Sequence, residues 1–190
     1  MYQGIRSFIA FDLDSESVLK KLADAQRLIV GTGADVKAVE PKNIHITLRF
    51  LGDIAVGTVD RVFEEMKNVQ FVPFDVRVHG IGAFPDVRYP RVVWAGMTEG
   101  ADQLRNIFAQ LEPRLRDLGF APDPKGFSPH LTIGRVRSGR NKDALAEFIT
   151  KNVDCDFGIV RAQCLRLKKS DLTPNGPIYT TLREFCPKNT

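Results

Sequence analysis

The first half of the chain shows the hydrophobic periods of strands and of helices in turn. Extended segments alternate apolar and polar residues with a period of two, whereas amphipathic helices repeat apolar residues at i, i+4 and i+7. One helix is expected after the acidic, hydroxyl-rich run 14–17, which suits a helix N-terminus, and a second helix is expected across 56–66. The predicted strands are residues 6–13, 34–39, 43–50 and 74–82.

The second half repeats this order of elements. Apolar positions across 104–118 predict a helix that Pro113 should kink or interrupt and that Gly119 should end. A further helix is expected around 145–149. The predicted strands are residues 91–97, 130–136, 156–169 and 177–185, and the last of them has no counterpart in the first half.

The register of the repeat is regular. The histidines of the two matching strands, His45 and His130, are 85 residues apart, and the first strands and second helices show nearly the same offset. We therefore predict one bilobal α+β domain over residues 1–190, with an approximate repeat of 5–85 and 90–170 and a C-terminal strand at 177–185. Each lobe is expected to be β-α-β-β-α-β-like with an antiparallel sheet, related to the other by a pseudo-two-fold axis, with a cleft between them.

Composition narrows the class of protein. In 190 residues, 43% are hydrophobic and 26% are charged, which are ordinary globular values, and no apolar run reaches the roughly 20 residues needed to span a bilayer. The three cysteines are odd in number and lack metal-ligand spacing, so we expect no disulfide framework and a cytoplasmic location. A net charge of +4 permits a polyanionic ligand without requiring one.

Two of the three histidines open matching tetrapeptides, 45–48 (HITL) and 130–133 (HLTI). In a strand, the histidine and the threonine two positions later point to the same face, and the two apolar residues point to the other. The lobes should therefore present two imidazoles and two hydroxyls, those of Thr47 and Thr132, to the shared cleft. His79 has neither partner nor counterpart, and a structural role is expected for it.

Two imidazoles on opposite sides of one centre suit proton transfer, because an unperturbed pKa of about 6.5 lets each give or take a proton near neutral pH. The pairing fits in-line displacement at phosphorus, with the threonine hydroxyls donating to phosphate oxygens. The scheme requires no metal and no cofactor. A zinc site is less favoured, because neither tetrapeptide brings a third ligand at a suitable spacing.

Longer stretches around the tetrapeptides carry a family resemblance. Residues 9–14 (IAFDLD), 43–53 (NIHITLRFLGD), 91–96 (RVVWAG) and 127–136 (FSPHLTIGRV) are similar to bacterial and archaeal RNA 2′,3′-cyclic phosphodiesterases, also called 2′–5′ RNA ligases, of the two-histidine phosphoesterase superfamily. The resemblance covers about residues 5–185. It implies hydrolysis of RNA 2′,3′-cyclic phosphates to 2′-phosphates, with His45 as proton donor and His130 as proton acceptor. The residues themselves do not distinguish these two roles.

Arg135 resembles the phosphate-contacting arginine of that family, and a guanidinium can bind two phosphate oxygens at once. Strict alternation would place it on the face opposite His130, so a bulge or bend near Gly134 is expected. The equivalent position of the first half is Phe50. Arg49 shares parity with His45, and either a substrate contact or a solvated charge would fit it.

The resemblance implies RNA ends as partners, with tRNA halves among them. No membrane partner is expected, and the chain is expected to be a monomer. Two alternatives are kept: ATP-independent reversible 2′–5′ RNA ligation, and a non-catalytic RNA-binding module. The basic clusters 135–142 and 166–169 could steer RNA or could simply be solvated. Some aromatic residues near the tetrapeptides could stack on a terminal base, although core packing is the default for each: Phe50, Phe84, Tyr89 and Phe127.

Overall fold

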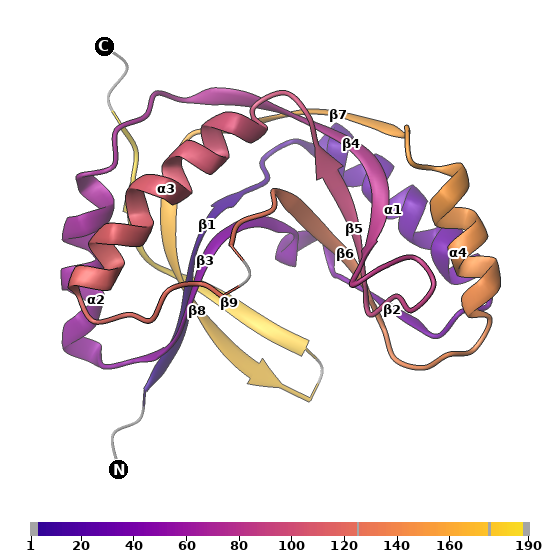
Figure 1. The fold of residues 1–190 in the computed structure, drawn as a ribbon, viewed down its shortest axis with the longest axis horizontal. Coiled ribbons are helices and arrows are strands. Elements are labelled where there is room, and N and C mark those ends of the chain that lie inside the picture. Colours follow the sequence, from indigo (N-terminus) through magenta and orange to yellow (C-terminus); the bar gives the residue numbers. More distant parts are fainter. Residues whose placement is uncertain (1–3, 125, 175, 188–190) are drawn as a thin grey trace.

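The computed structural model describes residues 4–124, 126–174 and 176–187 and shows an α+β fold, as predicted (Figure 1). Its strands are β1 (Ile5–Asp12), β2 (Val36–Ala38), β3 (His45–Ile54), β4 (Phe74–Phe84), β5 (Val92–Met97), β6 (His130–Val136), β7 (Asp156–Ala162), β8 (Leu165–Thr173) and β9 (Gly176–Phe185). Its helices are α1 (Glu16–Gly31), α2 (Val56–Lys67), α3 (Ala101–Asp117) and α4 (Lys142–Lys151), with a 3₁₀ turn, η1 (Pro41–Asn43).

The strands form one continuous antiparallel sheet in the order β7-β4-β5-β6-β3-β1-β8-β9, with β2 also paired to β6. Its two halves meet where β3 pairs with β6 through Ile46 and Leu131. The strands of each half of the sheet come from both halves of the chain, because β4 pairs with β5 and β7, and β8 pairs with β1. The sequence repeat therefore does not coincide with the spatial grouping of the strands.

One predicted strand was wrong. Residues 156–169 were expected to be continuous, but β7 ends at Ala162 and β8 begins at Leu165. β7 is the edge strand beside β4, whereas β8 lies beside β1 in the other half of the sheet. The chain crosses between the two halves within this short connection, which the hydrophobic pattern did not reveal.

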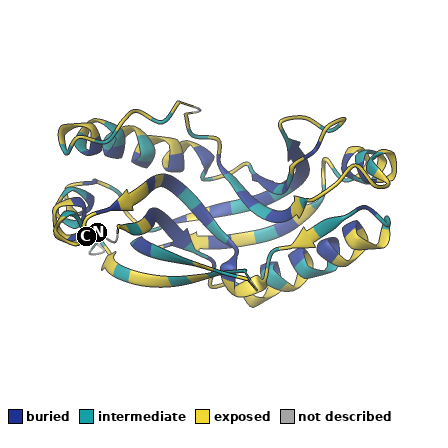
Figure 2. Ribbon diagram, turned by 90° about the horizontal axis from the view of Figure 1, so that it is seen from below, coloured by how far each residue is buried: buried dark blue, intermediate teal, exposed yellow. Residues whose placement is uncertain are grey.

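The helices cover the sheet on its outer side and arise where their caps and apolar faces predict (Figures 1 and 2). The Ser15 hydroxyl accepts a hydrogen bond from the Val18 N–H at the start of α1. Gly119 follows α3 with a φ of +94°, a conformation that favours glycine. Pro113 does not interrupt α3. The fully buried Leu111 and Leu115 on either side of it hold the helix against the core.

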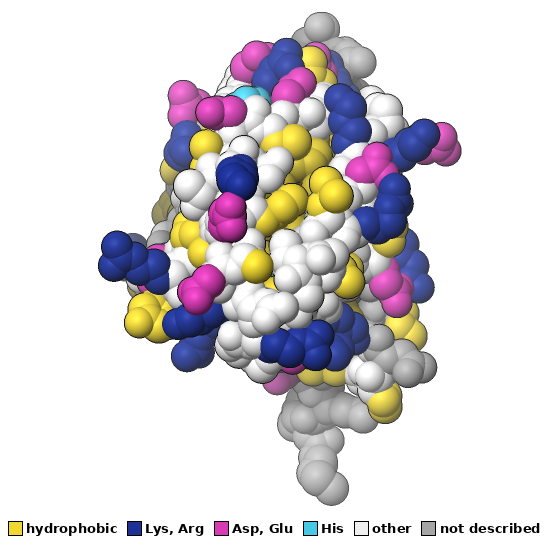
Figure 3. Space-filling model, turned by 90° about the vertical axis from the view of Figure 1, so that its right-hand side faces the viewer, with side chains coloured by type: hydrophobic (Ala, Val, Ile, Leu, Met, Phe, Trp, Pro, Cys, Tyr) yellow, Lys and Arg dark blue, Asp and Glu magenta, His cyan; other side chains and the backbone are white. Residues whose placement is uncertain are grey.

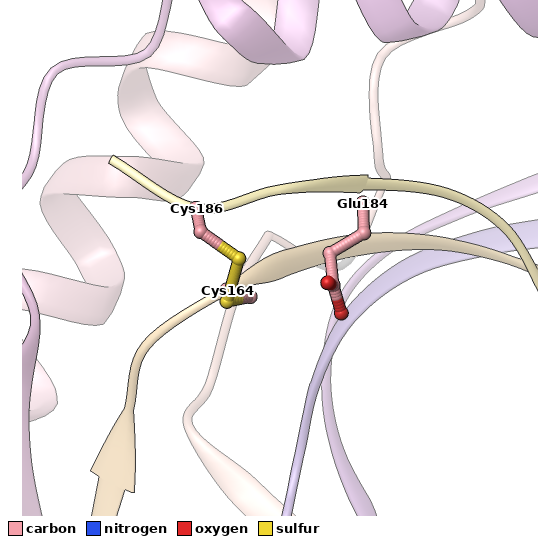
Figure 4. Close-up of side chains that lie close together, drawn as sticks. All are labelled: Cys164, Glu184 and Cys186. Atoms are coloured by element: carbon pink, nitrogen blue, oxygen red, sulfur yellow. A yellow bond between two sulfur atoms is a disulfide. The ribbon is translucent and has the colours of Figure 1, made fainter. Parts of the chain in front are cut away.

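A disulfide joins Cys164 to Cys186, so the expectation of no disulfide was wrong (Figure 4). The two cysteines flank the β8–β9 hairpin, in which Leu165 pairs with Phe185. Sequence spacing alone could not show that this hairpin brings them together. The disulfide also removes the cysteine-based argument for a cytoplasmic location. Among the described residues, no helix combines the length and apolar character needed to cross a membrane.

Candidate active site

A cleft of about 480 Å³ contains all five residues singled out from the sequence: His45, Thr47, His130, Thr132 and Arg135. It lies where β3 and β6 meet, and β1, β2, β8 and β9 complete its walls. Residues that are 85 positions apart in the chain thus share one cavity because their strands are neighbours in the sheet.

The register between β3 and β6 determines how the two tetrapeptides face each other. Ile46 pairs with Leu131, and both side chains are buried. Continued by one residue in each direction, this antiparallel register puts His45 across from Thr132 and Thr47 across from His130. The two histidines are therefore diagonal neighbours across this pair, and the Cα atoms of diagonal neighbours in a regular ladder lie about 7–8 Å apart.

Both imidazoles make the same hydrogen bond. The Nδ1 atom of His45 lies 2.8 Å from the Asn43 carbonyl oxygen, and the Nδ1 atom of His130 lies 2.7 Å from that of Ser128. Because a carbonyl oxygen only accepts, Nδ1 must carry the proton in each ring. Nε2 is then the nitrogen available to give or take a proton at the cleft.

The two imidazoles differ in their surroundings. His45 stacks on Phe8 at 4.8 Å between ring centroids and meets the edge of Tyr179 at 5.1 Å, whereas His130 meets Phe84 edge-on at 5.0 Å. Burial, reinforced by Lys168 and Arg135, lowers the pKa of His45 to about 4, and burial with Arg135 also lowers the pKa of His130. Both imidazoles are therefore neutral at pH 7 while the cleft contains no anion.

The predicted bulge near Gly134 is present and brings Arg135 onto the cleft face. In the pairing with β5, Val93 lies opposite Gly134 while Trp94 lies opposite Thr132, so Ile133 is the extra residue. Because the bulge shifts the alternation by one residue, Arg135 lines the same cleft as the histidine. It is also close enough to lower the pKa of both imidazoles.

The first half of the chain has the same bulge. In the pairing of β1 with β3, Ile9 lies opposite Arg49 and Ala10 opposite Thr47, which leaves Leu48 as the extra residue. The first six residues of both strands share one order of half-buried, buried and exposed positions. Phe50 consequently lines the cleft at the place equivalent to Arg135.

The comparisons with known proteins agree with this geometry. The family model described as "LigT like Phosphoesterase" matches residues 13–94 and 96–179, and each segment contains one of the two tetrapeptides. The chain belongs to the LigT-like phosphoesterase family. These two segments cover most of its length, and they include His45, Thr47, Phe50, His130, Thr132 and Arg135 of the cleft.

Two relatives align with this chain over nearly their whole length. An Archaeoglobus fulgidus protein named RNA 2′,3′-cyclic phosphodiesterase is 40% identical over 181 residues, which cover 95% of this chain and 99% of the relative. An Aeropyrum pernix protein of the same name is 40% identical over 164 residues, 86% of this chain and 93% of the relative.

Solved structures show the same fold. A crystal structure of a Thermus thermophilus protein has a TM-score of 0.79 at 27% identity, covering 96% of this chain and 97% of that one. Escherichia coli LigT complexed with 3′-AMP has a TM-score of 0.77 at 19% identity, covering 98% and 99%.

In this LigT-like phosphoesterase, the same bulge turns Arg49 away from the cleft. Arg49 is 8% exposed, pairs through Nε with Glu112 of α3, and donates to the carbonyl oxygens of Phe50 and Ala121. It is thus neither a substrate contact nor a solvated charge, the two interpretations that the sequence left open. Its role is to fasten α3 and the following loop to β3.

Two cleft residues were missed from the sequence. Tyr179 of β9 packs edge-on against His45, and its pKa is raised by burial. Asn43 uses its carbonyl to orient His45 and its side-chain amide to donate to the Pro177 carbonyl of β9, at 3.1 Å. The contact of Tyr179 and the hydrogen bond from Asn43 to Pro177 depend on how β9 crosses toward η1, and strand periodicity carries no signal for that crossing. The Asn43 carbonyl, by contrast, lies only two residues before His45 in the chain.

Several side chains of the two basic clusters contact groups of the protein itself. Lys168 binds both carboxylate oxygens of Asp12, at 2.6 and 2.8 Å, and Lys169 pairs with Asp171. Beyond Arg135, Arg140 donates to the Gly33 carbonyl and Lys142 lies over the Tyr89 ring. On the face that carries α4, basic side chains are interspersed with acidic ones and form no continuous patch (Figure 3). These contacts favour the solvated or internally paired interpretation of both clusters.

The remaining candidates lie elsewhere. Among the described residues, His79, Tyr89 and Phe127 are absent from the cleft lining; His79 belongs to β4, and Phe127 stacks on Phe108.

The one described group of three possible metal ligands is Cys164, Glu184 and Cys186 (Figure 4). Its two sulfur atoms are bonded to each other, and Glu184 pairs with Arg166. The residues present there therefore do not offer a thiolate metal site.

Proposed function

We propose that the protein hydrolyses 2′,3′-cyclic phosphates at RNA ends, breaking the bond to the 3′ oxygen and leaving a 2′-phosphate. The observation that carries the proposal is the pair of identically oriented imidazoles, set with two threonines and one arginine in a single cleft. The relatives named RNA 2′,3′-cyclic phosphodiesterase support the choice of substrate.

In the proposed mechanism one histidine accepts a proton and the other donates one, so the number of protons on the pair does not change. Nε2 of His130 accepts a proton from water as the hydroxide oxygen bonds to phosphorus. Nε2 of His45 donates a proton to the 3′ oxygen as the P–O3′ bond breaks. The low pKa of the His130 imidazole keeps it neutral and able to act as the base. His45 becomes a proton donor when the anionic phosphate binds beside it and stabilises its imidazolium form.

Thr47, Thr132 and Arg135 would hold the non-bridging oxygens. Hydroxyl and guanidinium donors fixed in a partly buried cleft stabilise charge as it develops on the phosphate. Monomeric state, tRNA halves as substrates and cytoplasmic location belong to the same proposal, and each stays a prediction.

The decisive experiment is end-group analysis of an oligonucleotide that carries a 2′,3′-cyclic phosphate, incubated with a chelator. We expect a 2′-phosphate product from the wild-type protein, and a fall of about 10²–10⁴-fold in rate for His45→Ala and for His130→Ala.

His79→Ala is the matched control, because the third histidine lies outside the cleft; it should keep wild-type activity. Near-wild-type turnover by either cleft variant would refute the proposed roles. A 3′-phosphate product would show that the wrong bond had been assigned.

A further inference from the structure

We propose that Lys168 of β8 is a positioning residue for the reaction: its ammonium group, opposed by the Asp12 carboxylate, sets the pH at which the His45 imidazole gains its proton. The inference rests on the proposed function and deepens it, because it names the charged pair that prepares the proton donor. Among the described residues, neither Lys168 nor Asp12 lines the cleft, so both act through the histidine.

The pairing of the strands places both charges beside His45. Asp12 lies directly opposite His45 where β1 pairs with β3, and Lys168 lies opposite Phe8 where β1 pairs with β8. Phe8 and Asp12 are four positions apart in β1, and residues paired across antiparallel strands share a face of the sheet. His45 stacks on the Phe8 ring at 4.8 Å between centroids. The carboxylate, the ammonium group and the imidazole therefore project from one face of three neighbouring strands.

The two charges are fixed to each other. The Lys168 side chain is 11% exposed, and its Nζ atom donates to both carboxylate oxygens of Asp12, at 2.6 and 2.8 Å. Arg166 reaches the same carboxylate at 3.4 Å and also pairs with Glu184. Lysine is almost never buried without a partner, and a buried ion pair is weak evidence for stability. The place of this pair beside a proton-transferring ring gives it a chemical use.

Titratable groups reach His45 from every strand around it. They are Asp12 of β1, Arg135 and His130 of β6, Lys168 of β8 and Tyr179 of β9. Glu40 also lines the cleft, and it pairs with Lys42. Burial is the largest cause of the low pKa of His45; Lys168 lowers that pKa further, and Asp12 raises it. The imidazole is thus held between opposite charges, and removal of either charge should move its titration in a defined direction.

This pair distinguishes the two imidazoles of the cleft. Both rings make the same backbone hydrogen bond, and Arg135 lowers the pKa of both. Lys168 and Asp12 belong to β8 and β1, which continue the sheet on the His45 side of the junction between β3 and β6. The proposed proton donor therefore has a charged pair behind it, whereas burial and Arg135 lower the pKa of the proposed proton acceptor.

The test follows two quantities: the NMR titration midpoint of His45 in the free protein, and the pH dependence of kcat for an oligonucleotide ending in a 2′,3′-cyclic phosphate. Lys168→Met removes the cation that opposes the imidazolium. It should raise the midpoint by about one pH unit and move the alkaline limb of kcat upward. Asp12→Asn should move both downward. KM should change less than about twofold in either variant, because neither side chain lines the cleft.

The controls separate charge from folding. The double variant Lys168→Met/Asp12→Asn removes both charges, and its midpoint should lie between those of the single variants. Lys168→Arg keeps the cation and should keep the alkaline limb of kcat at its wild-type pH. Lys169→Met is the matched control, because the next residue of β8 pairs with Asp171 and is absent from the cleft lining. It should change neither quantity.

An unchanged His45 midpoint in Lys168→Met would overturn the positioning role while leaving the hydrolase intact. So would a shift in the same direction in Lys168→Met and Asp12→Asn, because that result would report a general loss of structure. Absence of hydrolysis by the wild-type protein would instead refute the proposed function, and the role of Lys168 in the reaction with it, even with midpoints that move as expected.

Discussion

At the scale of single residues, the cleft is built from two copies of one hydrogen-bonded histidine in different surroundings. His45 stacks on Phe8, meets Tyr179 edge-on and is influenced by Lys168, whereas His130 meets one ring edge-on. The tetrapeptides predicted that the histidines and threonines share a face, and the cleft agrees. They could not predict the contact of Tyr179 with His45, because that contact depends on where β9 crosses.

The pKa of His45 should rise when an anion enters the cleft. The free protein holds it at about 4 because burial disfavours the imidazolium, so at pH 7 the ring is neutral. A bound nucleoside 2′-monophosphate supplies the opposite charge, and the titration midpoint should therefore move upward. Proton NMR titration of the imidazole signals, with and without the nucleotide, measures this shift.

His79 provides the internal control for that titration, since its signals should not respond to the nucleotide. A midpoint for His45 that is unchanged or lower in the complex would contradict the role of proton donor. The same reasoning predicts that kcat reaches its maximum at a higher pH than kcat/KM, which reports the free protein.

At the scale of elements, the two bulges decide which side chains reach the cleft. The carbonyl of Ile133, the bulge residue of β6, accepts hydrogen bonds from the Val39 N–H and from Gln26 of α1, at 3.0 and 2.7 Å. The Gln26 amide also donates to the Val39 carbonyl at 2.7 Å. The sequence predicted the bulge of β6, because strict alternation would have kept Arg135 off the face that carries His130. It did not predict the equivalent bulge at Leu48 of β3, which buries Arg49.

Gln26→Leu should therefore weaken both the fold and the placement of Arg135. It leaves the part-buried Val39 carbonyl and the buried Ile133 carbonyl without this donor, which costs about 1–3 kcal/mol of unfolding free energy. Chemical denaturation measures the loss, and a raised KM for cyclic phosphate would report the relaxed bulge.

Gln103→Leu makes the same substitution at an exposed position of α3 and should change neither quantity. Equal stability of the two variants would show that the Gln26 amide does not support the bulge.

At the scale of the whole molecule, the chain exchanges strands between its halves. The α+β class, the offset of 85 residues and most element positions could be predicted, since they follow from local periodicity. The crossing at Ala162–Leu165, the continuous sheet and the disulfide could not, because pairing between distant strands leaves no mark in the alternation of a single strand.

This exchange predicts that neither half folds by itself. A fragment of residues 1–90 would lack both partners of β4 and the β8 neighbour of β1, leaving hydrogen-bonding edges and apolar faces uncovered. Circular dichroism and amide proton dispersion should show an unfolded fragment. A cooperative thermal transition in the isolated fragment would contradict the interdependence of the halves.

The paired bulges allow one wall of the cleft to differ from the other. The side chain that follows each bulge enters the cavity, while His45 and His130 stay anchored by backbone carbonyls. A substitution at position 50 or at position 135 therefore alters one wall of the cavity while the two hydrogen-bonded imidazoles keep their places.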